Sequence, residues 1–152
     1  MHDDDPLAAL RRTWTDEIPI TAAMDVRPLR FEDHGLHVRA TLAPNVNVHG
    51  TAFAGSLYAV AALSGWGLVH LELGAAELAG GIVIAEGGIE YLRPVQEDIE
   101  AVCRTDASSV RSVLAQLETA GRARWPLTAT IDADGREAVR FEGVYAVRLR
   151  DR

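Results

Sequence analysis

One apolar segment limits the folds open to this chain more than any other feature. From Thr51 to Leu73 the residues are apolar on nearly all sides, over a length too great for a strand. A helix without a polar face must be enclosed by other structure or span a membrane. Its most apolar part, Leu57 to Leu71, has about fifteen residues, fewer than the roughly twenty that a span requires. We therefore expect a buried core helix and no membrane partner.

Segments on both sides of this helix follow the alternation typical of strands. Leu36, Val38, Ala40 and Leu42 alternate with polar residues, so we expect them on one face of a sheet. The expected strands cover residues 20–31, 36–42, 82–92, 99–105, 122–131 and 138–149. An Asp-Gly pair between the last two strands predicts a hairpin.

Two shorter segments add helical structure. Asp5 and Pro6 are typical of a helix start, and apolar residues recur at helical spacing as far as Trp14, so we expect a helix ending near Glu17. Residues 108–119 are expected to form a turn or a short helical piece.

This order of elements predicts an α+β fold. A curved antiparallel sheet of about six strands wrapped around one long central helix, with a short N-terminal helix, is the simplest arrangement that encloses the apolar helix. A length of 152 residues fits a single domain over residues 1–152. Within it we expect an N-terminal helix and arm at 1–18 and the core at 19–150.

Composition excludes several classes of function. The net charge is −7, so no basic surplus exists for binding nucleic acid, and all 15 basic residues are arginine, which excludes a Schiff-base lysine. The five scattered histidines and the lone Cys103 predict no metal site. That cysteine cannot form an internal disulfide, and the acidic start MHDDDPLAALRR is unlike a signal peptide. We therefore expect a cytoplasmic protein with an inert buried thiol.

Three segments resemble the hot-dog thioesterases, in particular those related to the C-terminal domain of YiiD. They are NVNVHGTAFAGSLYAVAALSGWG, GIEYLRPVQEDIEAV and GREAVRFEGVYAV. The resemblance implies hydrolysis of acyl thioesters carried by coenzyme A or acyl carrier protein. It implies no cofactor beyond the coenzyme A or phosphopantetheine of the substrate. It also implies a homodimer with edge-to-edge sheets and active sites between subunits, with a tetramer of two dimers as the alternative.

The resemblance also implies a place for the catalytic groups. Many of these enzymes resemble the pattern asparagine-x-x-glycine-x-x-histidine-glycine-glycine, followed by a carboxylate on the helix. Here Asn47 and Gly50 match the first two positions, whereas the histidine-glycine-glycine place holds Phe53, an alanine and Gly55. The carboxylate position falls at Ala62, and alanine cannot activate water.

Other residues are candidates for the chemistry. The backbone N–H groups of Gly55 and Ser56, at the helix start, are expected to polarise the thioester carbonyl. Asn47 and Thr51 could orient a water molecule, although Thr51 could instead be a plain N-cap. His49 could act as general base, although a turn residue is the simpler interpretation.

A carboxylate from the sheet is another candidate base. Glu86 or Glu90, which share one face of the expected strand, could supply it, and a solvated face is the alternative. The expected substrate-binding residues are Phe53, Tyr58, Ser64, Tyr91 and Arg93. Several of these residues could instead have a structural role. Tyr58 could lie in the core, Ser64 could donate a hydrogen bond to its own helix, and Arg93 could form a salt bridge.

Two functions from different classes follow. The first is an acyl thioesterase, and the second is a non-catalytic protein that binds acyl thioesters, which the alanine at position 62 favours. A hydratase or dehydratase of the same fold is less favoured, because it needs a histidine paired with a carboxylate across the substrate.

Overall fold

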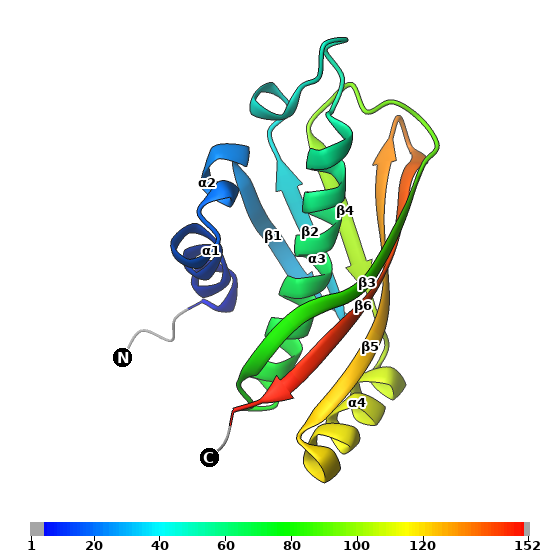
Figure 1. Cartoon of the computed structure of the whole chain (residues 1–152). Helices are drawn as coiled ribbons and strands as arrows, with labels where there is room; N and C mark the ends of the chain where they lie inside the picture. The colour runs from blue at the N-terminus through cyan, green and yellow to red at the C-terminus, as the bar shows by residue number, and fades with distance from the viewer. Residues whose placement is uncertain (1–4, 151–152) are drawn as a thin grey trace.

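A six-stranded antiparallel sheet forms the body of the protein (Figure 1). The computed structural model describes residues 5–150. The strands lie in the spatial order β1-β2-β4-β5-β6-β3. Their bounds are β1 Val26–Glu32, β2 Gly35–Ala40, β3 Gly80–Tyr91, β4 Ile99–Arg104, β5 Arg122–Ala133 and β6 Arg136–Leu149. The sheet curves around the long helix α3 (Ala54–Ala75), which confirms the α+β hot-dog arrangement.

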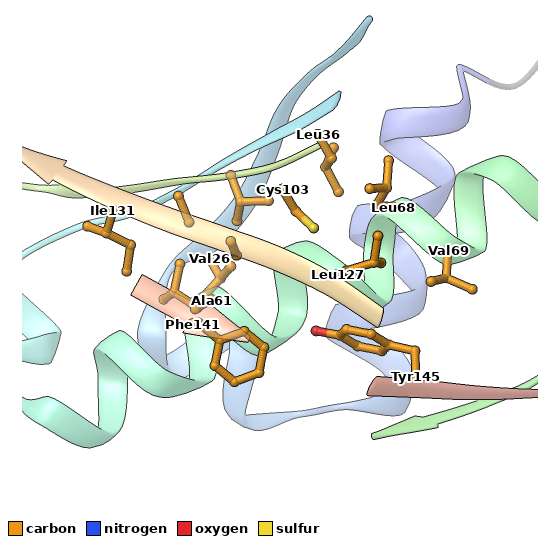
Figure 2. Close-up of a cluster of buried hydrophobic side chains, with 14 of the residues drawn as sticks. Val26, Leu36, Ala61, Leu68, Val69, Cys103, Leu127, Ile131, Phe141 and Tyr145 are labelled. Carbon is orange, nitrogen blue, oxygen red and sulfur yellow. The ribbon is translucent and has the colours of Figure 1, made fainter. Parts of the chain in front are cut away.

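Helix α3 lies in the core. The helix has 22 residues, which by length and composition alone would be enough to span a membrane. The sequence had predicted a shorter apolar run. Half of the most apolar stretch of the helix is buried inside the protein. The concave face of the sheet encloses it. Figure 2 shows Leu127, Phe141 and Tyr145 gathered against the side of α3 that carries Ala61, and all four residues are buried. The helix is therefore a core helix, as predicted.

Two glycines let α3 approach its neighbours closely. Gly65 lies against the phenol of Tyr145, where any Cβ would collide with the ring and its hydroxyl. That hydroxyl donates a hydrogen bond to the carbonyl of Ala62 over 2.7 Å. Gly67 packs in the same way against Leu36 and Trp14. A side chain at either position would push the sheet or the N-terminal helix away.

The N-terminal helix forms as the sequence predicts. In α1 (Pro6–Glu17) the side chain of Asp5 accepts a hydrogen bond from the N–H of Leu7 over 3.1 Å, and Pro6 occupies the first turn. Leu10 and Trp14 are fully buried on one face. Because α1 packs on β1 and α3, it covers one edge of the sheet.

The expected strand at 20–31 is wrong in its first half. Residues Ile20–Met24 form the short helix α2, and the strand β1 begins only at Val26. The helix buries Thr21 and Met24 and ends at Asp25 in a left-handed conformation. Thr21 and Met24 are three positions apart, so a helix places both on its buried side. This burial outweighs the preference of the β-branched residues for a strand.

The second half of the chain contains a full helix where a turn or short piece was expected. Helix α4 (Ala107–Ala120) has 14 residues, with Asp106 as N-cap and Gly121 in the left-handed conformation at its end. The 3-10 turn η1 (Ala43–Asn45) precedes α3. The tight turn between β5 and β6 holds the Asp134-Gly135 pair, as predicted.

Strand β3 is the open edge of the sheet. Most of its residues are exposed, and its register against β6 shifts between Ile84 and Glu86. The indole Nε1 of Trp66 donates to the carbonyl of Ile82 over 3.0 Å and ties the start of this strand to α3. In contrast, Cys103 on β4 is fully buried, and burial raises the pKa of its thiol to about 12. The expectation of a buried thiol is therefore confirmed.

Candidate active site

The loop that precedes α3 is pinned at both ends. The buried side chain of Asn45 donates to the carbonyls of Met24 and Thr41 over 2.8 and 2.7 Å. The backbone carbonyl of Asn45 accepts the N–H of Phe53 over 2.7 Å, and the N–H of Ala52 donates to the backbone carbonyl of Val95 over 2.8 Å. Sequence reasoning missed the role of Asn45, because only the fold brings its partners together.

Asn47 shapes the turn within this loop. Its Oδ1 accepts the N–H groups of His49 and Thr51 over 2.8 and 3.2 Å. Its Nδ2 donates to Thr51 Oγ1 over 2.8 Å and to the carbonyl of Ala52 over 3.4 Å. An amide side chain offers two donors and two lone pairs, so no capacity remains for orienting water. Gly50, with φ of 78°, completes the turn.

Thr51 is not the N-cap of the helix. Helix α3 begins three residues later, with Phe53 as the N-cap in an extended conformation and without a side-chain cap bond. The hydroxyl of Thr51 instead accepts the bond from Asn47. The role of Thr51 as cap is therefore wrong, whereas its role in orienting water stays a prediction, because one bond from Asn47 leaves the O–H donor of its hydroxyl unused.

His49 lies at the tip of the loop and is exposed. Its ring makes no hydrogen bond or ion pair with any residue in 5–150, and Val48 beside it is 94% exposed. The structure therefore leaves the His49 ring free for a ligand but provides no orienting partner from the same chain.

The first amides of α3 have no acceptor. The first N–H of the helix that is bonded belongs to Leu57, which donates to Phe53 over 3.0 Å, whereas within residues 5–150 the N–H groups of Ala54, Gly55 and Ser56 have no partner. The helix dipole adds positive potential at this point. The half-exposed Phe53 ring lies against Gly55, with its Cε1 atom 2.6 Å from where a Cβ would stand.

Tyr91 and Arg93 lie at the same end of the molecule. The hydroxyl of Tyr91 donates to the carbonyl of Ala54 over 2.9 Å. Burial, assisted by Tyr58, raises the pKa of Tyr91, so its hydroxyl stays protonated. Arg93 is exposed beside a hollow of about 410 Å³ that Arg136 also lines, and it makes no salt bridge within the described part of the chain.

Glu86 does not reach the helix start. It pairs with Val144 in the register of β3 and β6, and Glu90 pairs with Arg140, so both carboxylates point to the outer face of the sheet. Glu86 is 71% exposed at its side chain and lies 3.4 Å from Arg124. The two glutamates share one face as expected, but α3 lies on the other, and the hypothesis of Glu86 as base is wrong for the single chain.

Two expected substrate contacts have structural roles. Ser64 is fully buried and its Oγ donates to the carbonyl of Ala61 over 2.6 Å, so it is unavailable to a substrate. Tyr58 packs edge-on against Phe141 with ring centroids 5.2 Å apart, and its hydroxyl lies over Gly87 of β3. It remains half-buried and lines the side of α3 next to the open edge.

Along α3 no carboxylate replaces the alanine at position 62. The one acid on α3, Glu72, is buried at the far end of the helix, where its Oε1 lies 2.6 Å from His34 Nδ1. Residues 5–150 contain no group of three or more side chains that could hold a metal ion. The arrangement thus offers hydrogen-bond donors and one free imidazole, and its chemistry is polarisation of an acceptor oxygen.

Comparison with known proteins identifies the family of this chain. The model of the putative thioesterase family of the YiiD C-terminal domain matches residues 7–149. A putative thioesterase from Shewanella oneidensis is 37% identical, with a TM-score of 0.83 over 95% of this chain and 99% of that chain. A protein of unknown function from Chlorobaculum tepidum is 31% identical, with a TM-score of 0.90 over 93% of both chains. A mutant thioesterase from Pseudomonas aeruginosa is 17% identical, with a TM-score of 0.75 over 98% and 97%, which supports the fold alone.

Proposed function

The chain belongs to the putative thioesterase family of the YiiD C-terminal domain, and from that premise we propose that it hydrolyses an acyl thioester carried by coenzyme A or acyl carrier protein. The observation that supports this most is the set of unbonded N–H groups at the start of α3. The family match supports a thioesterase-like function.

The N–H groups of Gly55 and Ser56 would receive the thioester oxygen. Water adds to the carbonyl carbon, negative charge develops on that oxygen, and the thiol of the carrier leaves when the intermediate collapses. Donors aimed at a developing oxyanion lower the barrier by about 3 kcal/mol. Gly55 has no side chain to block the approach, and Tyr91 fixes the backbone of Ala54 beside it.

His49 would take the proton from the attacking water. It is the imidazole nearest in sequence to the helix start, and Asn47 holds its backbone N–H over 2.8 Å. In this proposal Asn47 is a positioning residue that acts through the loop. The open side of α3, where Tyr58 is half-buried, would take the acyl chain, and Arg93 would meet the phosphates of the carrier.

A homodimer would complete the site. The open edge of β3 exposes unpaired backbone groups along its length, and twofold pairing with a second copy satisfies them. Two such dimers forming a tetramer is the alternative assembly. The lone buried thiol supports a reducing, cytoplasmic location.

A hydrolysis screen tests the proposal. Purified protein is incubated with acyl-CoA and acyl carrier protein substrates of several chain lengths, and released thiol is measured. Turnover is expected with at least one substrate, and His49→Ala should lower kcat/KM by about a hundredfold. Glu90→Gln, on the outer face, is the matched control. Absence of thiol release from every substrate would refute hydrolysis.

A non-catalytic binder is the second candidate. It is favoured by the absence of any carboxylate at Ala62 or beside it on α3 within the described chain. Calorimetry would distinguish the two: heat of binding with a thioester that stays intact for hours identifies a binder.

A further inference from the structure

Three arginines surround a hollow on the outer face of the sheet, which we call the arginine hollow. Arg122 and Arg124 come from β5 and Arg148 comes from β6, and between them the floor consists of Gly81, Val83 and Ala146. The hollow is open to solvent and has a volume of about 710 Å³. Helix α4 borders the hollow through Gln116, and Figure 1 shows that helix beside the first residues of β5.

The charges in this hollow are poorly compensated. Arg122 and Arg148 are direct partners in the register of β5 and β6, so two like charges stand opposite each other on one face. Neither makes an ion pair with any residue of 5–150. Within the described residues the only counter-charge paired with these arginines is Glu86, exposed to solvent 3.4 Å from Arg124. No acidic residue among 5–150 lines the hollow, although the chain carries a net charge of −7.

Opposed like charges destabilise a sheet, so an anion that bridges them would relieve a cost already present in the fold. Guanidinium groups match both carboxylate and phosphate with paired hydrogen bonds. Phosphate fits two opposed arginines better, because a phosphate group carries a charge of about −2 and a carboxylate only −1.

The floor of the hollow suits an uncharged body attached to that phosphate. Val83 is 62% exposed, and nothing lies within 4 Å of where a Cβ on Gly81 would stand. Ala146 contributes only a methyl group. A flat or apolar group could therefore lie on the strands between the arginines, as a nucleotide base would.

We propose that the arginine hollow binds a phosphate-bearing small molecule of nucleotide size, with its phosphates between Arg122 and Arg148 and its uncharged part on the Gly81–Val83–Ala146 floor. The hollow lies at the opposite end of β3 from Tyr91, about 30 Å along the strand. Within one chain it is therefore separate from the start of α3. The binding does not require thioester hydrolysis.

Calorimetry with ADP and with inorganic pyrophosphate tests this proposal on the intact protein. Both probes are expected to bind, ADP more tightly because of the floor, and binding should weaken as salt is added. The double variant Arg122→Gln/Arg148→Gln should weaken ADP affinity by more than about tenfold. Its melting temperature should not fall, because the change removes like-charge repulsion. Arg140→Gln, on the same face but held by Glu137 and Glu142, is the matched control.

Kinetics identify the source of the ligand. If the double variant raises KM for acyl-CoA but not for an acyl thioester without a nucleotide, the ligand is the nucleotide part of the substrate. If neither KM changes while ADP binding is lost, the ligand is a free nucleotide. Either result agrees with the proposal. It is overturned if wild-type protein binds neither probe at millimolar concentration, or if the double variant binds ADP as well as Arg140→Gln does.

Discussion

Tyr91, the last residue of β3, donates a hydrogen bond over 2.9 Å to the carbonyl of Ala54, the first residue of α3. The bond joins the open edge strand to the helix start, where three amides have no acceptor within residues 5–150. Tyr91, for which the sequence predicts substrate binding, thus holds the backbone next to the proposed oxyanion donors.

Tyr91→Phe should lower kcat/KM for thioester hydrolysis by about tenfold, because a helix start free to shift aims its amides less well. Loss of the surface bond should cost about 1 kcal/mol of unfolding free energy or less. Thr119→Ala removes a similar hydroxyl-to-carbonyl bond of 2.9 Å on α4 and is the control for stability. Equal kinetics for Tyr91→Phe and wild type would show that this bond does not support the site.

Gly55→Ala should lower kcat/KM by more than about tenfold. The new Cβ would meet the ring of Phe53 at 2.6 Å, so the ring next to the amides has to shift. Because alanine favours helix, the variant should be no less stable to urea. In a Phe53→Ala background the same change should have little effect on kinetics, as a double-mutant cycle would measure. Full activity in the single variant would contradict this arrangement.

Gly65→Ala should destabilise the fold by about 2 kcal/mol or more, because the added methyl group overlaps the phenol of Tyr145. Gly74→Ala is the matched control near the end of the same helix, where a Cβ meets nothing within 4 Å. It should be neutral or stabilising by up to about 1 kcal/mol. Urea denaturation of the two variants measures both values. A Gly65→Ala protein as stable as the Gly74→Ala protein would show that the helix does not need this close approach.

Acidification should destabilise the protein through His70. Burial lowers the pKa of its imidazole, partly opposed by Glu17, and the ring stacks on Trp66 with centroids 5.2 Å apart. Because the unfolded chain binds the proton more readily, stability is full above about pH 6.5 and falls as pH drops from there towards the lower folded pKa. His70→Gln should reduce the difference in unfolding free energy between about pH 8 and about pH 5. Burial also lowers the pKa of His37, so some dependence will remain. If His70→Gln showed the same pH dependence of unfolding free energy as wild type, His70 would not be the cause of the acid destabilisation.

Periodicity was sufficient to predict the architecture. The apolar run at 51–73 and the alternation in the strands each report burial directly, and together they predict a helix inside a sheet. The sequence places the start of α3 three residues early, because threonine is a common N-cap residue. In the structure the hydroxyl of Thr51 instead accepts a hydrogen bond from Asn47. Residues 20–24 were misassigned since local composition does not show which side chains the rest of the fold will bury.

The candidate site was less predictable. Unbonded backbone amides at the helix start could be predicted, because every helix has them. The outward direction of Glu86 could not, because it depends on the register of β3 against β6. Asn47 illustrates the same limit. Its side chain has the chemistry to hold water, but the turn uses all of its hydrogen-bonding capacity.

The central claim is that the amides of Gly55 and Ser56 receive the thioester oxygen, and amide NMR tests it most directly. ¹⁵N-labelled protein is titrated with a non-hydrolysable acyl-CoA analogue that keeps the carbonyl. We predict that both amide protons move downfield to saturation, as expected when a free N–H gains an acceptor, and that the amide of Gly74 does not move. Saturable binding that shifts other amides and leaves those of Gly55 and Ser56 unchanged would contradict the claim.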